Sequence, residues 1–127
     1  FERAANPKVI KQILKRAYPS GKNIDDELIE ILYNPSQREN SKEAFRGFIN
    51  LFDDYLATDL FDKIDTPIQL IWGEKDPWES LKEARSWKQK YKNIKRLDIV
   101  NNAGHCPHDE EPEVTNNLIY KFIQETK

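Results

Sequence analysis

The spacing of apolar residues divides the chain into a helical first half and a second half in which strands and helices alternate. In the first half, apolar residues recur every three or four positions, which is the period of an amphipathic helix. We expect a first helix to begin at Pro7 behind an Asn6 cap, and a second to begin near Asp25 and end before Pro35. Proline, serine and glycine at positions 19–21 separate the two helices.

A third predicted helix begins after Asn40 or Ser41 and is the most aromatic part of the chain. Its apolar face carries Phe45, Phe48, Ile49, Phe52 and Leu56. A stripe of this kind most often belongs to a hydrophobic core, and it also suits the wall of a pocket for an apolar ligand. Both readings stay open from the sequence.

After Pro67 the pattern changes to strand, helix, strand and helix. The predicted strands cover residues 68–72 and 97–100, and the predicted helices cover 79–91 and 113–124. This alternation indicates parallel strands joined by a right-handed crossover. Two parallel strands leave both edges open and give the helices too little sheet to cover. We therefore expect an incomplete sheet, completed by polypeptide from elsewhere or by a second copy of the chain.

Composition narrows the possible functions. With 20 basic and 22 acidic side chains, the net charge is -2, so nothing indicates a nucleic-acid-binding surface. No apolar run approaches the roughly 20 residues that span a bilayer, and the N-terminus lacks the layout of a signal peptide. The single cysteine fits a reducing compartment, so we expect a cytoplasmic protein, or one of the plastid stroma in a plant. Because the chain has no methionine, we expect it to be a piece of a longer polypeptide.

Two residues carry the candidate chemistry, each just after a predicted strand. Asp76 follows the first strand and His105 the second, with Gly73 and Gly104 expected to let the chain turn there. Because parallel strands end at the same edge of a sheet, both side chains are expected at that edge, where such sheets bind ligands. An aspartate beside a histidine is two-thirds of a catalytic triad. The ordinary alternative is that both are merely turn and loop residues.

A metal site is the competing reading of the histidine loop. Four residues able to bind a metal lie close together there: His105, Cys106, His108 and Asp109. Structural zinc sites usually draw on two separated pairs of ligands, and this chain has one cysteine. We therefore predict no metal and no cofactor. Cys106 has no lysine or arginine nearby in sequence to activate it, and we expect it to serve in packing.

Two segments carry a resemblance to a known family. Residues 67–78, PIQLIWGEKDPW, followed by residues 103–112, AGHCPHDEEP, resemble the C-terminal portion of α/β-hydrolases. The nearest branch is that of the cyanobacterial and plastid pheophytinase-like proteins, which pair a WGxKDPWE segment with a GHCPxDExP segment. Together and in this order the two segments are a fairly specific signal, whereas either alone would be weak.

The resemblance implies a partial α/β-hydrolase fold, with a helical cap segment at 1–62 and the last two parallel strands with their helices at 63–127. It implies that Asp76 is the triad acid and His105 the general base, and that the serine comes earlier in the fold. None of the four glycines flanks a serine in a G-x-S-x-G pattern, so we expect the isolated chain to be inactive.

The parent enzyme is expected to cleave an ester-like bond in a hydrophobic small molecule. The candidate substrate-binding residues are bulky and apolar: Phe45, Phe48, Phe52 and Trp78. Dehalogenases, thioesterases and carbon–carbon hydrolases on this fold are alternatives, because they use the same acid and histidine. A non-catalytic association module is the alternative of another class, supported by the open sheet and the apolar helix faces.

Overall fold

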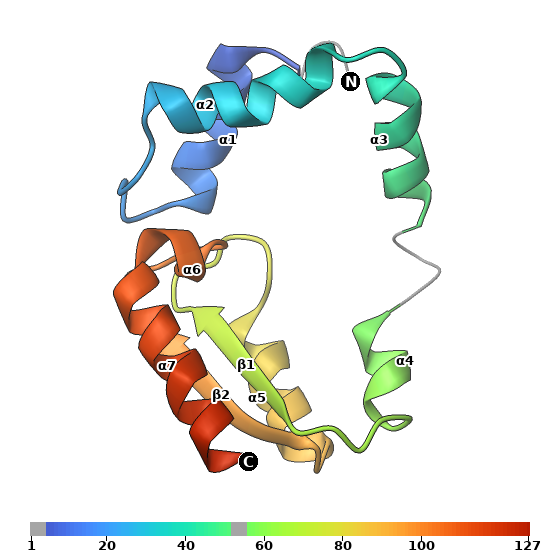
Figure 1. The fold of residues 1–127 in the computed structure, drawn as a ribbon, viewed down its shortest axis with the longest axis vertical. Coiled ribbons are helices and arrows are strands. Elements are labelled where there is room, and N and C mark those ends of the chain that lie inside the picture. The colour runs from blue at the N-terminus through green and yellow to red at the C-terminus, as the bar shows by residue number, and fades with distance from the viewer. Residues whose placement is uncertain (1–4, 52–55) are drawn as a thin grey trace.

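The structure, a computed structural model, describes residues 5–51 and 56–127. Its elements in chain order are α1 (Pro7–Ala17), α2 (Asp26–Tyr33), the 3₁₀ helix η1 (Asn34–Gln37), α3 (Ser41–Asn50), α4 (Ala57–Phe61), β1 (Ile68–Gly73), α5 (Leu81–Lys90), β2 (Ile94–Val100), α6 (Pro107–Glu110) and α7 (Pro112–Glu125). Helices α1 to α3 lie at one end of the molecule, and the sheet with α5 and α7 lies at the other (Figure 1). Among the described residues, no helix has the length and apolar content needed to cross a bilayer.

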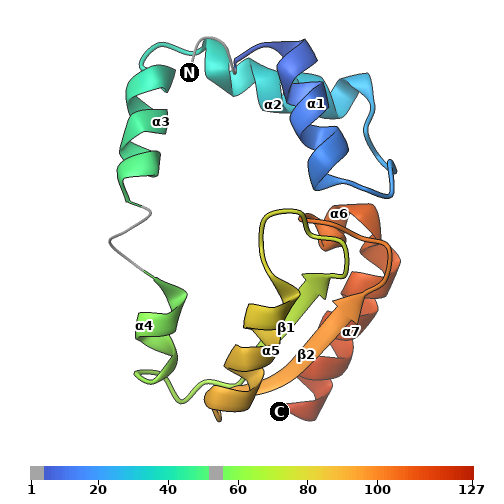
Figure 2. The same ribbon diagram turned by 180° about the vertical axis from the view of Figure 1, so that it is seen from behind.

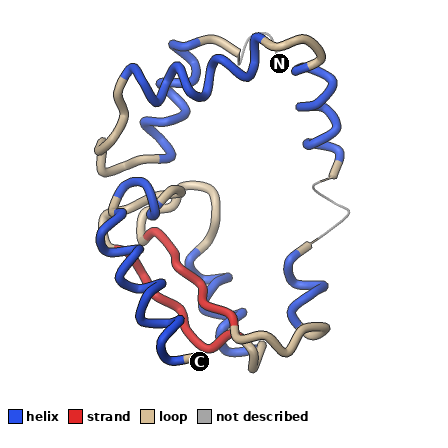
Figure 3. The backbone as a smooth tube through the Cα atoms, viewed as in Figure 1, coloured by secondary structure: helices blue, strands red, loops and turns tan. Residues whose placement is uncertain are grey.

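Strands β1 and β2 form a two-stranded parallel sheet (Figure 3). Ile68 pairs with Ile94 at one end of the ladder and Gly73 with Val100 at the other. Helix α5 connects the strands and α7 follows β2, and the two helices lie on opposite faces of the sheet (Figure 2). The sequence pattern predicted this βαβα order, and the structure confirms it.

Alternate side chains of β1 contact the two covering helices. The Gln69 amide donates a hydrogen bond to the Leu118 carbonyl of α7, at 3.2 Å. On the other face, the Trp72 ring meets Trp87 of α5 edge-to-face, with ring centroids 5.8 Å apart. This alternation is the period of two that a strand imposes on its side chains.

The buried apolar residues form two small clusters. One, between α1 and α2, contains Leu14, Ala17, Tyr18 and Ile29. The other, where α4, the end of α5 and the start of β2 meet, contains Phe61, Tyr91 and Ile94. Many large apolar side chains stay outside both clusters; Ile31 is 58% exposed, Phe48 57% and Tyr120 62%. The described residues therefore leave much of their own apolar surface uncovered, as expected of a partial fold with an incomplete sheet.

Two glycines allow the loop after β1 to lie directly against the loop after β2. A Cβ atom at Gly73 would lie 2.7 Å from the Ala103 carbonyl oxygen and closer still to that of Gly104. The Glu74 N–H donates to the Val100 carbonyl at 3.0 Å, and the Lys75 N–H to the Ala103 carbonyl at 2.9 Å. Because the approach is between backbones, no side-chain rotation would relieve a clash.

The structure gives these glycines a more specific role than the sequence did. We expected them to let the chain turn near the strand ends, and of the described glycines only Gly21 has a positive φ, at 70°. Gly73 and Gly104 are required because the neighbouring backbone leaves no room for a Cβ atom. At Gly104 that backbone belongs to α1, since the added atom would meet the Ala17 carbonyl oxygen.

The third helix is shorter than the sequence predicted. It ends at Asn50, where the Leu51 N–H turns back to the Phe48 carbonyl at 3.1 Å, and a separate helix, α4, begins at Ala57. Phe52 lies outside the described residues, and Phe45 and Phe48 are exposed, so the core reading of this stripe is wrong for both.

Strand β2 begins at Ile94, earlier than predicted. The sequence pattern missed this start because the charged residues Lys95 and Arg96 interrupt the apolar run. Arg96 lies within the strand and its guanidinium pairs with Asp98 at 2.6 Å and with Glu125 of α7 at 3.0 Å. This pairing lets a charged residue occupy a partly buried strand position. Pro35 lies within η1 where we expected a loop, and the short helix α6 was not anticipated.

We predict that Gly73→Ala lowers the free energy of unfolding by about 2–3 kcal/mol, because the added methyl group forces two backbones apart. Urea denaturation followed by circular dichroism measures the change. Gly47→Ala is the matched control: nothing lies within 4 Å of a Cβ atom there, and Gly47 is inside α3. The free energy of unfolding of that variant should rise by about 0.5–1 kcal/mol, because alanine has a higher helix propensity than glycine. Equal stability of Gly73→Ala and the unmodified protein would contradict the close approach.

Candidate active site

The loop after β1 holds the Asp76 carboxylate in a fixed orientation. Its Oδ1 atom accepts hydrogen bonds from two backbone N–H groups, those of Trp78 at 2.9 Å and Glu79 at 3.0 Å. The side chain is only 8% exposed. Both bonds are local to the turn Asp-Pro-Trp-Glu, which is a common role for aspartate. They leave the second oxygen, Oδ2, directed at the neighbouring loop.

That second oxygen lies against the imidazole of His105. The distance from Asp76 Oδ2 to His105 Nδ1 is 3.0 Å. Because an ionised carboxylate only accepts hydrogen bonds, the neutral ring carries its proton on Nδ1 and leaves Nε2 as an acceptor. The His105 side chain is 40% exposed, so the pair opens to the surface rather than being enclosed. The proximity expected from the strand order is found, while the catalytic roles of the two residues stay a prediction.

Two further contacts hold His105, one through its backbone and one through its ring. The His105 backbone N–H donates to the Ala17 carbonyl at the end of α1, at 2.8 Å. The Trp78 ring meets the imidazole edge-to-face, with centroids 4.8 Å apart. A small cavity of about 190 Å³ adjoins the pair; its lining residues are Ile71, Trp72, Gly73, Asp76, Glu79, His105 and Pro107.

The hydrogen bonds keep Asp76 charged. Burial alone would raise the pKa of this carboxyl group, but the N–H groups of Glu79 and Trp78 and the contact with His105 outweigh it. The pKa of Asp76 is therefore lower than that of an ordinary aspartate. An ionised acid is the form that orients a histidine and stabilises it when it takes up a proton.

Cys106 has the surroundings of a packing residue. Burial raises the pKa of its thiol, with the carboxylates of Asp109, Glu110 and Asp76 adding to the effect against a hydrogen bond from Tyr18. A raised pKa disfavours the thiolate, which is the nucleophilic form. The side chain packs against the cluster between α1 and α2.

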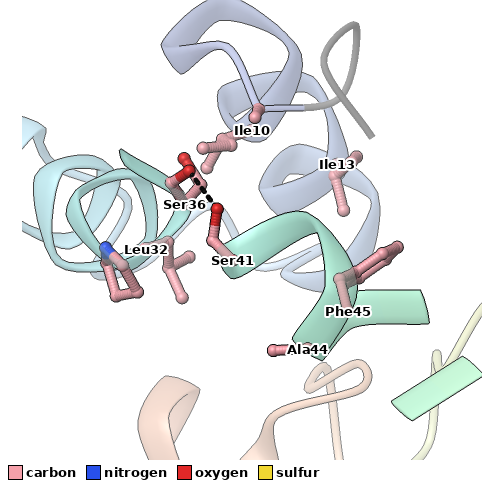
Figure 4. A pocket seen from close by; sticks show the side chains of 9 residues that line it. Ile10, Ile13, Leu32, Ser36, Ser41, Ala44 and Phe45 are labelled. Carbon is pink, nitrogen blue, oxygen red and sulfur yellow. Dashed lines mark hydrogen bonds between the residues drawn. The ribbon is translucent and has the colours of Figure 1, made fainter. Parts of the chain in front are cut away.

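The four predicted substrate-binding residues do not share one cavity. Trp78 lies beside His105, whereas Phe45 lines a separate apolar cavity of about 440 Å³ between α1, α2 and α3 (Figure 4). Phe48 packs near Phe45, with ring centroids 6.5 Å apart, and Phe52 is outside the described residues. Ile10, Ile13 and Leu32 complete the apolar wall around Phe45.

The metal reading of the histidine loop finds no matching geometry in the part of the chain that is described. No three side chains of the types that bind metals gather there. His105 faces Asp76, and Asp109 accepts a hydrogen bond from the Tyr18 hydroxyl at 2.7 Å.

Sequence reasoning missed two partners of the histidine loop. One is the Ala17 carbonyl, a backbone group that no side-chain pattern reveals. The other is Glu110, which is buried although it lies in an acidic run that looks solvated. Two signals pointed to the second: its position between Pro107 and Pro112, and its match to the fixed glutamate of the GHCPxDExP segment.

The depressed pKa of Asp76 predicts a pH-dependent contribution to stability. A carboxyl group whose pKa falls on folding stabilises the protein above its unfolded pKa of about 3.9, and this contribution is lost as the pH falls through the folded value. Asp76→Asn cannot titrate. We expect the variant to be less stable at pH 6–7 and the difference to shrink below about pH 4. Urea denaturation of both proteins between pH 7 and pH 3 measures this, and a difference independent of pH would contradict it.

Comparison with known proteins points to hydrolases of one fold. No family model matches the chain. It is 27% identical to the chloroplastic pheophytinase of Arabidopsis thaliana over 128 residues, which covers 98% of this chain and 26% of that protein. Human epoxide hydrolase 4 is 36% identical over 62 residues, covering 49% of this chain and 17% of that protein. The chain thus spans about a quarter or less of these relatives.

Solved structures give the same result for the fold. A serine hydrolase involved in carbazole degradation superposes with a TM-score of 0.82 at 18% identity, covering 94% of this chain and 48% of that one. A structure assigned as a lipase from Acinetobacter baumannii superposes with a TM-score of 0.77 at 20% identity, covering 97% of this chain and 43% of that one. At these identities the likeness establishes fold. The chain has a partial α/β-hydrolase fold, and its sequence is similar to that of a plastid pheophytinase.

Proposed function

We propose that this chain supplies the acid and the histidine of a serine-type triad, in an α/β-hydrolase that cleaves an ester-like bond of a hydrophobic small molecule. The observation that carries the proposal is the 3.0 Å contact between Asp76 Oδ2 and His105 Nδ1. The other carboxylate oxygen is already occupied by two backbone N–H groups, so the acid is orientated before any substrate binds. The similarity to four hydrolases supports the general class.

In the proposed mechanism, His105 Nε2 takes the proton of a serine hydroxyl as that oxygen attacks the substrate carbonyl. Asp76 holds the imidazole in the required tautomer and stabilises the positive charge that forms. His105 then returns the proton to the leaving group, and water releases the acyl group by the same steps in reverse. The serine and the N–H groups of the oxyanion hole are proposed to come from polypeptide outside these residues, because the sequence has no G-x-S-x-G segment.

The proposed preference for a hydrophobic substrate depends on two features. Trp78 is 44% exposed and stands beside His105, where it would meet the group next to the scissile bond. The cavity lined by Phe45 is nearly all apolar and lies among the helices of the predicted cap. The type of bond that is cleaved is less constrained than the hydrophobic character of the substrate, since one relative is named for pheophytin and another for epoxides. The compartment also stays a prediction: the cytoplasm, or the plastid stroma in a plant.

Replacing His105 in the whole protein tests the proposal. His105→Ala should lower kcat on p-nitrophenyl esters by about 10⁴-fold or more, because no other group would accept the serine proton. Asp76→Asn should lower it by about 10⁴-fold through loss of the correct tautomer. The control is His108→Ala, which removes an exposed histidine three positions away and should leave the rate unchanged. Comparable activity of the His105 and His108 variants would refute the proposed base.

The second candidate function is a non-catalytic association module, favoured by the exposed apolar side chains and by the outer edges of β1 and β2, which no other strand among the described residues pairs with. The oligomeric state of the isolated 127-residue chain separates the two, because neither function predicts ester hydrolysis by this chain alone. Under the hydrolase proposal it shows no ester hydrolysis above buffer, and hydrolysis that disappears with His105→Ala would contradict this. Light scattering after size exclusion gives the other readout: a defined dimer favours association, and a monomer argues against it.

A further inference from the structure

We propose that Glu110 is a positioning residue, whose buried carboxylate fixes the loop that carries His105 to the end of α1. The inference rests on the proposed function, because it assigns a role toward the proposed base. It concerns a side chain that does not contact the imidazole, and it acts only through the backbone next to it.

Glu110 is the most deeply buried charged residue among those described. It is 1% exposed, less than the buried side chain of Thr115 at 2%. Removing a carboxylate from water is costly unless hydrogen bonds replace those that water made. A carboxylate at this depth is therefore expected to be held by several donors at once.

Three donors surround this carboxylate. Oε1 accepts a hydrogen bond from the backbone N–H of Gly104. Oε2 accepts from the hydroxyl of Ser20 and from its backbone N–H, the latter at 3.2 Å. The Glu110 side chain, 90 positions from Ser20, thus joins the residue immediately before His105 to the turn that ends α1.

The histidine backbone is held on both sides by the same region. The Gly104 N–H is bound by Glu110, and the next N–H, that of His105, is bound by the Ala17 carbonyl at 2.8 Å. Consecutive N–H groups point in different directions, so holding both fixes the orientation of the peptide plane between them. The direction in which the imidazole leaves the backbone follows from that plane.

Neighbouring contacts join the same two segments but are more exposed. The Tyr18 hydroxyl donates to Asp109, and the Asn23 amide donates to the Asp109 carbonyl. Lys22 forms an ion pair with Glu111, whose side chain is 24% exposed. An exposed ion pair such as Lys22–Glu111 contributes little on its own, and the contacts to Asp109 do not reach the backbone beside His105. Glu110 is therefore the contact whose loss should move the histidine.

Glu110→Gln in the whole protein is the decisive variant. Glutamine keeps the size of the side chain but has one oxygen in place of two, so it cannot accept from both the Gly104 and the Ser20 backbone N–H groups. We expect kcat on p-nitrophenyl esters to fall about 10- to 100-fold, with KM changing less than about threefold, because a small displacement of the base affects the chemical step. The control is Glu111→Gln, one position away, whose kcat should stay within about twofold of that of the unmodified protein.

A spectroscopic readout separates positioning from a general loss of folding. The carbon-bound proton and ¹⁵N signals of the His105 imidazole should shift in Glu110→Gln while those of His108 stay in place. In Glu111→Gln, both sets should stay in place. If Glu110→Gln does not fold, Ser20→Ala replaces it, since it removes one donor and leaves the Gly104 bond; a shift of the His105 signals supports the proposal and unchanged signals overturn it.

The outcomes for this inference and for the proposed function are distinguishable. If His105→Ala is inactive but Glu110→Gln has the rate and imidazole signals of the unmodified protein, the positioning role is overturned and the triad proposal stands. If the His105 signals move in Glu110→Gln but His105→Ala retains activity, the triad proposal fails and the positioning role of Glu110 stands.

Discussion

The site depends on a close approach of two backbones at the carboxyl end of the sheet. The chain at Gly73 passes so near to residues 103 and 104 that no Cβ atom fits between them. Hydrogen bonds from the Glu74 and Lys75 N–H groups then join the two loops. Each such bond contributes only about 1 kcal/mol net, but together with the steric constraint they leave one relative position for the loops. Asp76 and His105 meet because of that position.

The helical half of the chain takes part in the same arrangement. The end of α1 contributes the Ala17 carbonyl to His105 and the Ser20 donors to Glu110, so the histidine loop lies between the sheet and α1. A Cβ atom at Gly104 would collide with the Ala17 carbonyl oxygen, so this second approach also leaves no room for a side chain. The helices therefore position the proposed base in addition to enclosing an apolar cavity.

Sequence patterns predicted the features that depend on local periodicity and on residue type. The βαβα order, the Asn6 cap, the start of the second helix near Asp25 and the placement of Asp76 and His105 at strand ends all have local causes. The resemblance in residues 67–78 and 103–112 led to the correct fold. The stripe of phenylalanines left the core and pocket readings both open, because a helical period says which side chains share a face but not what covers that face. Phe45 and Phe48 share a face that the described residues leave exposed.

The burial of Glu110 was not predictable for a different reason. Charge runs such as residues 109–111 are solvated in most proteins, and the donors of Ser20 and Gly104 make this one different. The same holds for Gly73 and Gly104: the sequence marked them as glycines but not as points where backbones touch. Contacts made across the fold decide both cases, and a single sequence carries little information about them.

The tautomer of His105 tests the central claim most directly. Long-range ¹H–¹⁵N correlation from the carbon-bound ring protons distinguishes the two nitrogens of a neutral imidazole. If the approach of the loops sets Asp76 against the ring, the neutral form carries its proton on Nδ1, and replacing Asp76 by asparagine changes the tautomer balance. A neutral His105 protonated mainly on Nε2, and unaffected by that substitution, would contradict the account.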